Sequence, residues 1–359
     1  MDNGFPYIVY EKNKTPREWG RSHGEQFRPA IKELLEVRKN LMLARNPDLK
    51  KDLDVLAKIQ WEKSRVFAAD LVEELQGMAE GSGLSITDIV IVNNYTDFRD
   101  IEGHDQGCST TYGKTSTDSF VGQTWDMHSS AKDYISMVHV PEQDGKPATV
   151  TFSLVGCVGM AGVNQHGGFI GVNNINTLGA KPGIIWPVLV RKVLQQKDFA
   201  GMYDVLAKVA PTSGHSYILG SSEQGGIWEV SPQLVECTGE VKDTGSIFHT
   251  NHCLGPKTKE IEFSSGINST TQDRYGILDR RLAGVKNGKE LEALLKDHEN
   301  YPKSICSHFE SGSQDPSMTC GGVVVDYTKK SAVFWRGCEV YDDNYSEKRF
   351  NLTEGQISS

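Results

Sequence analysis

The pattern of hydrophobic and turn-forming residues changes at about residue 107, and this change limits the fold more than any other feature of the sequence. Before it, apolar side chains recur at the spacing of one face of an α-helix. After it, short runs rich in β-branched and aromatic residues alternate with glycine, asparagine and aspartate. The sequence therefore predicts a helical first part followed by a larger part built mainly on β-strands.

Helical periodicity predicts three helices before this change. Residues 15–18 (TPRE) have the form of a capping box with proline in the first turn, and the helix that they open carries apolar residues as far as Leu41. A second helix is predicted at 49–80 and is ended by the glycines of 81–83. A third, short helix is predicted at 85–92, with the serine at its start as the cap.

Short strands dominate the remaining sequence. They are predicted at 120–125, 135–140, 149–154, 168–172, 216–219, 226–230, 322–325 and 332–335. Helices return at 184–195, 201–209 and 272–285. Two strand-rich blocks separated by helices predict two packed sheets with helices outside them. We expect an α+β fold in a single domain that spans residues 1–359.

Charge and hydropathy exclude two classes of partner. The net charge of −9 is spread along the chain, without the basic stripe that is typical of nucleic-acid binding. No apolar stretch reaches the roughly 18–20 residues of a membrane helix, and the polar N-terminus lacks the apolar core of a secretory signal. We therefore expect a soluble, cytoplasmic protein with no nucleic-acid and no membrane partner.

The cysteines indicate the same compartment. There are seven, they are widely scattered, and none forms a CxxC pair. This pattern disfavours a disulfide framework and a structural zinc site, and it favours a reducing environment. No metal and no cofactor are expected.

The bond between Gly107 and Cys108 has the chemistry of a self-cleaving junction. Glycine leaves its carbonyl open to attack. The thiol of Cys108 is expected to attack this carbonyl and take the acyl group from nitrogen, which leaves a thioester for water to hydrolyse. The new α-amino group of Cys108, with an ordinary pKa of about 7.7–8.0, is then a base for its own thiol. A lone cysteine is more often a buried apolar residue, so the assignment depends on its neighbours.

Two later segments offer the groups that such a nucleophile needs. Asp126 is a candidate for the carboxylate that orients it, although a turn aspartate is an equal interpretation. Asn251, within FHTNHC, is a candidate donor to the tetrahedral oxyanion, or else a loop residue. The same segment offers His249, His252 and Cys253 as metal ligands, but no second cluster with matching spacing completes a tetrahedral site.

Taken together, these segments resemble the acyl-coenzyme A:6-aminopenicillanic acid acyltransferase family, a branch of the N-terminal nucleophile hydrolases. The resemblance runs through most of the chain. Its specific part is the order of three segments, GCST at 107–110, GQTWD at 122–126 and HTNH at 249–252, and it also includes 19–24, 74–81, 161–164, 171–174 and 322–326. The family implies an αββα sandwich, cleavage into chains 1–107 and 108–359, and chemistry at small amides.

The resemblance also assigns roles to single residues. Matched by motif, Cys108 is the nucleophile, Asp126 the orienting carboxylate and Asn251 the oxyanion donor. Related amidases place another asparagine beside the site, for which Asn173 is the better match and Asn174 the second.

Two positions of this chain can be compared with those of amidases that cleave bile-salt and N-acylethanolamine amides. Arg274 matches an arginine that those enzymes carry on a helix after the oxyanion asparagine. Where they have a second arginine, this chain has Gln123, as the acyltransferase branch does. The resemblance therefore argues against a bile-salt or acylethanolamine substrate.

The expected function is that of a self-processing cysteine amidohydrolase acting on a small-molecule amide. An acyl-CoA-dependent N-acyltransferase is the alternative within the enzyme class, because both reactions share the Cys108 acyl-enzyme. An uncleaved, non-catalytic binding protein of the same fold is the alternative outside it. A serine hydrolase is disfavoured because no GxSxG segment is present. The C-terminal sequence QISS differs from the peroxisomal signal of the fungal penicillin enzyme, which argues against penicillin synthesis as the default.

Overall fold

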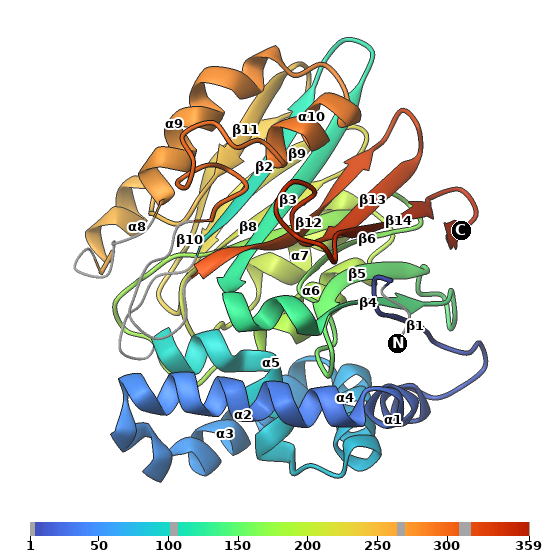
Figure 1. Ribbon diagram of the computed structural model, residues 1–359, viewed down its shortest axis with the longest axis vertical. Helices are drawn as coiled ribbons and strands as arrows, with labels where there is room; N and C mark the ends of the chain where they lie inside the picture. Colours follow the sequence, from blue (N-terminus) through green and yellow to red (C-terminus); the bar gives the residue numbers. More distant parts are fainter. Residues whose placement is uncertain (1–3, 101–106, 264–269, 309–316, 359) are drawn as a thin grey trace.

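Two stacked β-sheets form the centre of the computed structural model, which describes residues 4–100, 107–263, 270–308 and 317–358 (Figure 1). The first sheet has the strand order β1-β4-β5-β6-β7-β8-β9-β10. Its strands pair antiparallel, except that β1 runs parallel to β4. They are β1 (Tyr7–Val9), β4 (Ile135–Val140), β5 (Thr149–Leu154), β6 (Ala161–Asn164), β7 (Phe169–Asn174), β8 (His215–Gly220), β9 (Gly225–Val230) and β10 (Val235–Val241).

The second sheet is antiparallel and has the order β11-β2-β3-β12-β13-β14-β15. Its strands are β11 (Gly245–His249), β2 (Cys108–Lys114), β3 (Ser119–His128), β12 (Ser317–Asp326), β13 (Ser331–Arg336), β14 (Ser346–Asn351) and β15 (Gln356–Ser358). The eight strands predicted from the sequence are confirmed, but seven were missed: β1, β6, β10, β11, β14, β15 and, at the junction near residue 107, β2. Its sequence, CSTTYGK, is polar and gives no apolar signal, although nearly all of the strand is buried.

Helices cover the outer faces of both sheets. On the first sheet, α6 (Trp186–Leu194) packs on β6 and β7, and α7 (Phe199–Ala207) packs on β8. On the second, α10 (Gly288–Leu295) packs on β3 and β12. Beside it lies α9 (Thr271–Arg281), and α8 (Pro256–Glu260) lies farther away (Figure 1). The predicted α+β fold with an αββα layering is confirmed.

Side chains on the two faces of β3 and β12 contribute to two separate apolar cores. Val121, Val323 and Val325 belong to the large core between the sheets. Their strand neighbours Phe120 and Val324 belong to a second core beneath α9 and α10. Because successive side chains of a strand point to opposite faces, each of these strands supplies both cores.

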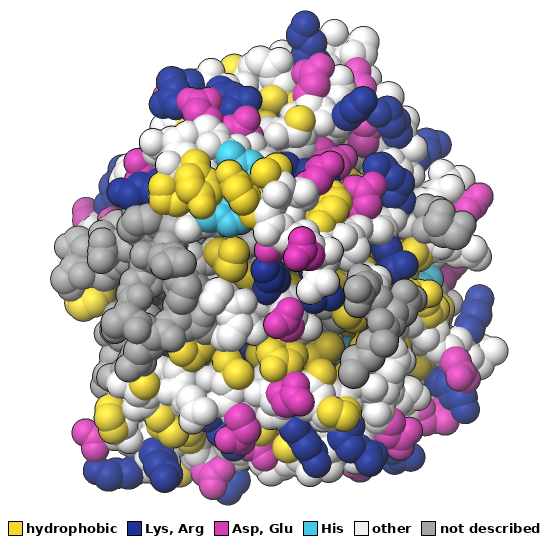
Figure 2. Space-filling view, viewed as in Figure 1, with side chains coloured by type: hydrophobic (Ala, Val, Ile, Leu, Met, Phe, Trp, Pro, Cys, Tyr) yellow, Lys and Arg dark blue, Asp and Glu magenta, His cyan; other side chains and the backbone are white. Residues whose placement is uncertain are grey.

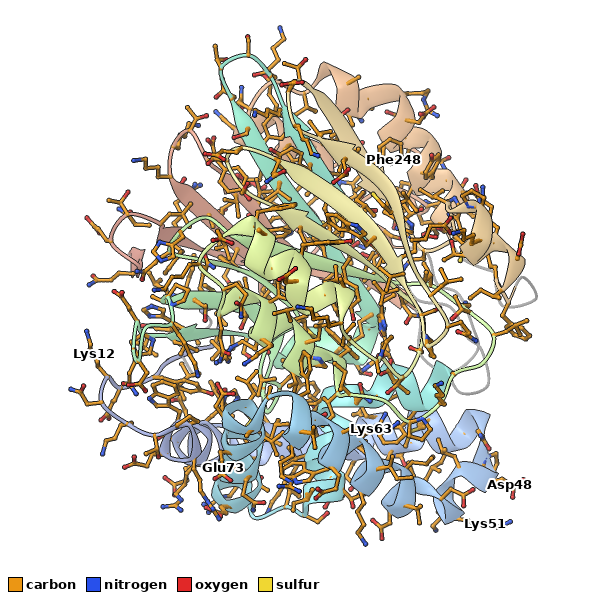
Figure 3. All side chains as sticks on the ribbon, turned by 180° about the vertical axis from the view of Figure 1, so that it is seen from behind. Lys12, Asp48, Lys51, Lys63, Glu73 and Phe248 are labelled. Atoms are coloured by element: carbon orange, nitrogen blue, oxygen red, sulfur yellow. The ribbon has the colours of Figure 1, made fainter. Side chains whose placement is uncertain are left out.

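The N-terminal helices gather at one end of the sheets (Figure 1). They are α1 (Pro16–Gln26), α2 (Arg28–Arg45), α3 (Leu53–Phe67), α4 (Ala69–Ser82) and α5 (Ile86–Asp100), with a short 3-10 turn at Pro47–Lys51. Further 3-10 turns lie outside this group, at Ser129–Tyr134 and Leu282–Gly284. Figure 3 shows Asp48 and Lys51 at the outer end of this group, where both side chains are exposed. No helix in the described part of the chain is both long and apolar enough to cross a membrane.

Two of the helices predicted from the sequence are each divided into two in the structure. The capping box of Thr15 and Glu18 is present, but the first predicted helix breaks at Phe27 (φ −109°, ψ 16°). Pro29, in the first turn of α2, cannot continue the preceding helix because it lacks an N–H and clashes with a carbonyl one turn earlier. The second predicted helix breaks at Ala68 (φ −153°, ψ 76°), where neither proline nor glycine gives a signal.

Glycines allow α1 and α4 to pack backbone against backbone. A Cβ atom on Gly20 would lie 1.8 Å from the carbonyl oxygen of Glu74, and one on Gly77 would lie 2.1 Å from that of Arg17. Gly24 and Gly81 make equivalent contacts one turn on. The prediction that the segment 81–83 ends the helix is confirmed, since α4 ends at Ser82 with Gly83 in the left-handed conformation, two residues beyond the predicted last residue at 80.

A buried ion pair joins α4 to α6. The carboxylate of Glu74 lies 3.1 Å from the guanidinium of Arg191, and both side chains are almost fully buried. Tyr10 donates a hydrogen bond to Glu74 at 2.9 Å. Burial, together with the charge of Arg191, lowers the pKa of the neighbouring His23 to about 3. His23 is therefore neutral at physiological pH, and its Nε2 accepts the backbone N–H of Gly156 at 2.8 Å.

We predict that Gly77→Ala destabilises the protein by about 3 kcal/mol, because the added methyl group forces two helix backbones apart. Gly276→Ala in α9 is the matched control, since its Cβ would approach only the flexible end of Arg280, at 3.5 Å. That change is expected to be neutral or to stabilise by up to about 1 kcal/mol. Urea denaturation of both variants measures the difference, and equal stabilities would contradict the close-packing interpretation.

Candidate active site

Cys108 is the first residue of β2 and lies in the interior of the protein. The side chain is 2% exposed. Cys108 is paired with Trp125 in the register of β2 and β3. The carbonyl oxygen of Gly107 accepts the backbone N–H of Asp126 at 3.0 Å. The peptide group that precedes the cysteine is therefore held by the neighbouring strand.

Glycine at 107 is required by close contact with Asp126. A Cβ atom on Gly107 would lie 2.4 Å from Oδ2 of Asp126. A side chain at this position would displace the carboxylate or the backbone. The absence of a side chain thus lets Asp126 lie directly against the Gly107–Cys108 junction.

Asn251 binds the backbone nitrogen of Cys108. Its Oδ1 accepts that N–H at 2.7 Å and also accepts Nη2 of Arg274 at 2.8 Å. Two donors therefore fix this atom as the amide oxygen. The amide nitrogen donates to the carbonyl of Asn174 at 3.0 Å. In the uncleaved chain this N–H is already bonded, so the oxyanion role of Asn251 stays a prediction.

The carbonyl of Cys108 is held by two side chains. Nδ2 of Asn173 donates to it at 2.8 Å, and Nη1 of Arg274 also donates to it. The hydroxyl of Thr110 donates to Oδ1 of Asn173 at 2.7 Å, which fixes the orientation of the Asn173 amide. Of the two predicted asparagines, Asn173 touches the nucleophile residue, whereas Asn174 reaches the site through its backbone carbonyl.

The carboxylate of Asp126 is buried and hydrogen-bonded. Thr319 donates to Oδ1 at 2.6 Å, and Nε of Arg274 lies 3.9 Å from Oδ2. Burial raises the pKa of Asp126, while the charge of Arg274 and the bond from Thr319 oppose this increase. Asp126 thus lies directly against the Gly107–Cys108 junction, and its orienting role stays a prediction.

The thiol of Cys108 is neutral at physiological pH in the uncleaved chain. Burial is the largest cause that raises its pKa, to about 12, and the charge of Asp126 acts in the same direction. Arg274 lowers the pKa, but its effect is smaller. The thiol therefore needs a base before it can act as a nucleophile, because the thiolate is the reactive form.

Gln123 connects the two sheets beside the site. Its amide donates to the carbonyl of Val172 at 2.6 Å and accepts the N–H of Val172 at 2.8 Å. A Cβ atom on Gly171 would lie 2.5 Å from its Oε1. Gln123 thereby fixes β7 next to β3 and positions Asn173, which follows Val172 directly.

The sequence missed the threonines that support the site. Thr319 holds Asp126, Thr110 holds Asn173, and Oγ1 of Thr271 accepts the N–H of Asn251 at 2.7 Å. Threonine is common in strands and at helix starts. No spacing pattern therefore distinguished these threonines from others in the chain.

The segment that contains Asn251 does not assemble the metal site considered from the sequence. Nε2 of His249 lies 2.7 Å from Glu229, and its Nδ1 lies 2.6 Å from the carbonyl of Thr250. Both ring nitrogens are therefore engaged. Among the described residues, His249, His252 and Cys253 are not part of any group with converging metal ligands.

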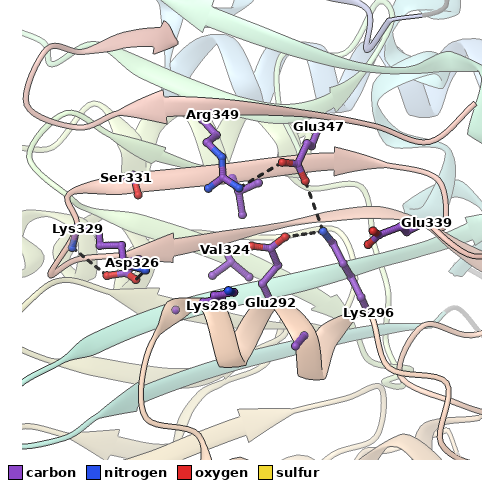
Figure 4. A pocket seen from close by; sticks show the side chains of 13 residues that line it. Lys289, Glu292, Lys296, Val324, Asp326, Lys329, Ser331, Glu339, Glu347 and Arg349 are labelled. Atoms are coloured by element: carbon purple, nitrogen blue, oxygen red, sulfur yellow. Dashed lines mark hydrogen bonds and ion pairs between the residues drawn. The ribbon is translucent and has the colours of Figure 1, made fainter. Parts of the chain in front are cut away.

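A hollow of about 510 Å³ lies elsewhere, between α10 and strands β12 to β14 (Figure 4). The side chains that line it are mostly charged, and several of these charges form ion pairs with one another. Lys296 contacts Glu292 at 2.5 Å and Glu347 at 3.7 Å, and Arg349 contacts Glu347 at 3.2 Å. Val324 lines it from the outer face of the second sheet. This hollow is distinct from the Cys108 site.

We predict that Arg274→Met, made in the uncleavable Cys108→Ala background, lowers the free energy of unfolding by about 3 kcal/mol. The change removes the cation that faces buried Asp126 and leaves hydrogen-bond acceptors without a donor. Arg280→Met, on the exposed face of the same helix, is the control and should change stability by less than about 0.5 kcal/mol. Denaturant unfolding compares the two variants; equal losses would show that Arg274 does not hold the site together.

Known proteins provide an independent comparison. A family model described as acyl-coenzyme A:6-aminopenicillanic acid acyl-transferase matches residues 113–320, more than half of the chain. The acyl-coenzyme A:6-aminopenicillanic-acid-acyltransferase 40 kDa form of Emericella nidulans is 27% identical over 327 residues, which cover 89% of each chain.

The matches among solved structures are more distant. Penicillin V acylase from Agrobacterium tumefaciens is 12% identical with a TM-score of 0.42, over 68% of this chain and 91% of that one. A mutant of the conjugated bile acid hydrolase from Clostridium perfringens is 10% identical with a TM-score of 0.42, over 70% and 95%. Family membership rests on the family model alone: the chain belongs to the acyl-coenzyme A:6-aminopenicillanic acid acyl-transferase family.

Proposed function

We propose that this protein cleaves its own Gly107–Cys108 bond and then uses Cys108 to cleave or transfer the acyl group of a small amide. The observation that carries the proposal is the environment of this one peptide bond. Both of its polar atoms are bound, the carbonyl by the N–H of Asp126 and the nitrogen by Asn251. An ordinary strand would need only backbone partners at such a position.

The first step is an intramolecular acyl shift. The sulfur of Cys108 bonds to the carbonyl carbon of Gly107, and the C–N bond breaks as the nitrogen takes up the proton that the thiol gave up. The N–H of Asp126 donates to the oxygen on which negative charge develops. Water then hydrolyses the thioester, which releases the Gly107 carboxylate and restores the thiol.

Cleavage changes the acid–base properties of the site. The amide nitrogen of Cys108 cannot act as a base, whereas the amine that replaces it has an ordinary pKa of about 7.7–8.0. Asn251 Oδ1 is placed to accept a hydrogen bond from this amine, because it already binds the same nitrogen. The amine is then the base that the neutral, buried thiol lacks in the uncleaved chain.

Two buried polar atoms have no partner among the described residues, one on the strand partner of Cys108 and one on the asparagine whose carbonyl binds Asn251. They are Nε1 of Trp125, a donor, and Oδ1 of Asn174, an acceptor. Trp125 is the strand partner of Cys108 and stacks on Trp186 with ring centroids 5.7 Å apart. A small amide whose carbonyl accepts from Nε1 of Trp125, with an apolar acyl group beside these rings, is the substrate class that this environment supports.

Hydrolysis and acyl transfer differ only in whether water or an amine receives the acyl group from Cys108. The fungal relative is an acyltransferase by name, so acyl-CoA-dependent transfer is the second candidate. We further propose a cytoplasmic location, since all seven cysteines are free thiols, as in reducing compartments.

Self-cleavage predicts two fragments of 107 and 252 residues (359 − 107 = 252), with Cys108 at the start of the larger. Denaturing gels and intact-mass analysis of fresh protein measure this directly. Cys108→Ala should stay intact, and Cys108→Ser should cleave slowly if at all. Cys237→Ala, at an exposed cysteine, is the control and should cleave normally. A wild-type chain that stays full-length under all conditions would refute the processing mechanism.

Acyl amides and acyl-CoAs tested with and without an added amine distinguish the two reactions. A hydrolase releases acid from the amide at a rate that the amine does not change, and a transferase forms a new amide at the expense of the acid. Mass spectrometry of denatured enzyme should detect the acyl group on Cys108 in either case. Cleaved protein that never acquires an acyl group from any of these compounds would contradict the catalytic proposal.

A further inference from the structure

Two histidines and two cysteines converge at a place that is separate from Cys108. His298, Cys306 and His308 follow α10, and Cys338 follows β13. One ligand atom of each residue lies within 4.8 Å of the ligand atoms of the other three. In the described part of the chain, no other group of histidine, cysteine and acidic side chains meets this condition.

The distances fit a tetrahedral metal site. Nε2 of His298 lies 3.3 Å from the sulfur of Cys338, and Nε2 of His308 lies 3.7 Å from that of Cys306. In a regular tetrahedron with Zn–S bonds of about 2.3 Å and Zn–N bonds of about 2.0–2.1 Å, sulfur and nitrogen ligands lie roughly 3.6 Å apart. Both sulfur–nitrogen distances are therefore close to the separation that a zinc ion imposes.

Both cysteine sulfurs of the cluster are shielded from solvent, and backbone N–H groups face one of them. Cys306 and Cys338 are both 2% exposed, and the backbone N–H groups of Val340 and Tyr341 donate hydrogen bonds to the sulfur of Cys338. Successive backbone N–H groups that point at one atom form an anion-binding turn. Two thiolates with two neutral imidazoles would balance the charge of a divalent cation.

The two histidines are covered by aromatic rings. Tyr341 lies 4.9 Å from the ring of His308 and 5.1 Å from that of His298, and the histidine rings stack on each other at 5.4 Å. Tyr301 and Tyr341 remain about half exposed. On the face shown in Figure 2, histidine side chains reach the surface within a group of hydrophobic side chains.

We propose that His298, Cys306, His308 and Cys338 form a structural zinc site. Because four protein ligands complete the tetrahedron, no position is open for water or substrate, and the metal has no direct part in the chemistry. Soft sulfur and imidazole ligands in this arrangement are typical of zinc. The sequence expectation of no zinc site relied on ligand spacing, and here the fourth ligand comes from a distant turn.

The proposed site is connected to the carboxylate beside Cys108. Ser307, between two of the ligands, pairs with Thr319 through the bonds Ser307 N–H to Thr319 Oγ1 at 2.8 Å and Thr319 N–H to Ser307 carbonyl at 2.9 Å. Thr319 in turn donates to Asp126. A metal that fixes the segment 298–308 would therefore also fix the position of Thr319.

Metal analysis of full-length protein, purified without a metal-affinity resin, tests the proposal. We expect about one zinc per chain in the wild type and in Cys108→Ala, so the result is independent of self-cleavage. Cys306→Ser and Cys338→Ser should lose the zinc, and Cys237→Ser, at a cysteine outside the cluster, should keep it. Cobalt exchanged into the wild type should give the absorption bands of a tetrahedral thiolate complex.

Thiol labelling keeps the test valid if the cysteine variants do not fold. In the folded wild type, zinc should protect Cys306 and Cys338 from alkylation, and a chelator should expose them until zinc is added back. Three results would overturn the proposal: no zinc bound and no protection on titration with zinc, equal zinc in the variants and the wild type, or a Cys306–Cys338 disulfide in freshly isolated protein.

Discussion

The buried guanidinium of Arg274 is the interaction on which the geometry of the site depends. It reaches from α9 to the carbonyl of Cys108 and to the amide of Asn251, and it faces the carboxylate of Asp126. A charge without access to water must have its donors satisfied and an anion nearby. These requirements bring together a helix, the start of β2 and the loop after β11, which are far apart in the sequence.

Several parts of the fold and site could be predicted because their signals are local. Alternating apolar residues predicted β4 and β5 at their observed bounds, and the box at Thr15 and Glu18 predicted the start of α1. The residues Cys108, Asp126, Asn173, Asn251 and Arg274, taken from family motifs, do converge in space. The motifs identified these residues because the family shares the same segments in the same order along the sequence. No single segment shows which residues touch one another.

Other features had no local signal. The break at Ala68 separates α3 from α4 at a point where the sequence favours a continuous helix. Thr319 became part of the site only through the pairing of β12 with β3, which aligns it with Asp126. The cluster of His298, Cys306, His308 and Cys338 likewise depends on where a turn after β13 meets a loop after α10. Tertiary contacts of this kind cannot be derived from spacing along one segment.

The ion pair of Glu74 and Arg191 has a consequence for a chain cut after Gly107. Glu74 lies before that point and Arg191 after it, and β1 is hydrogen-bonded to β4 across the same division. Separating the two pieces would expose an unpaired buried charge, a sheet edge and the apolar core that α2, α4 and α5 share with the rest. A cut at this bond would therefore change connectivity without changing composition. The product would be a permanent two-chain complex, in which the first piece is a subunit and not a discarded leader.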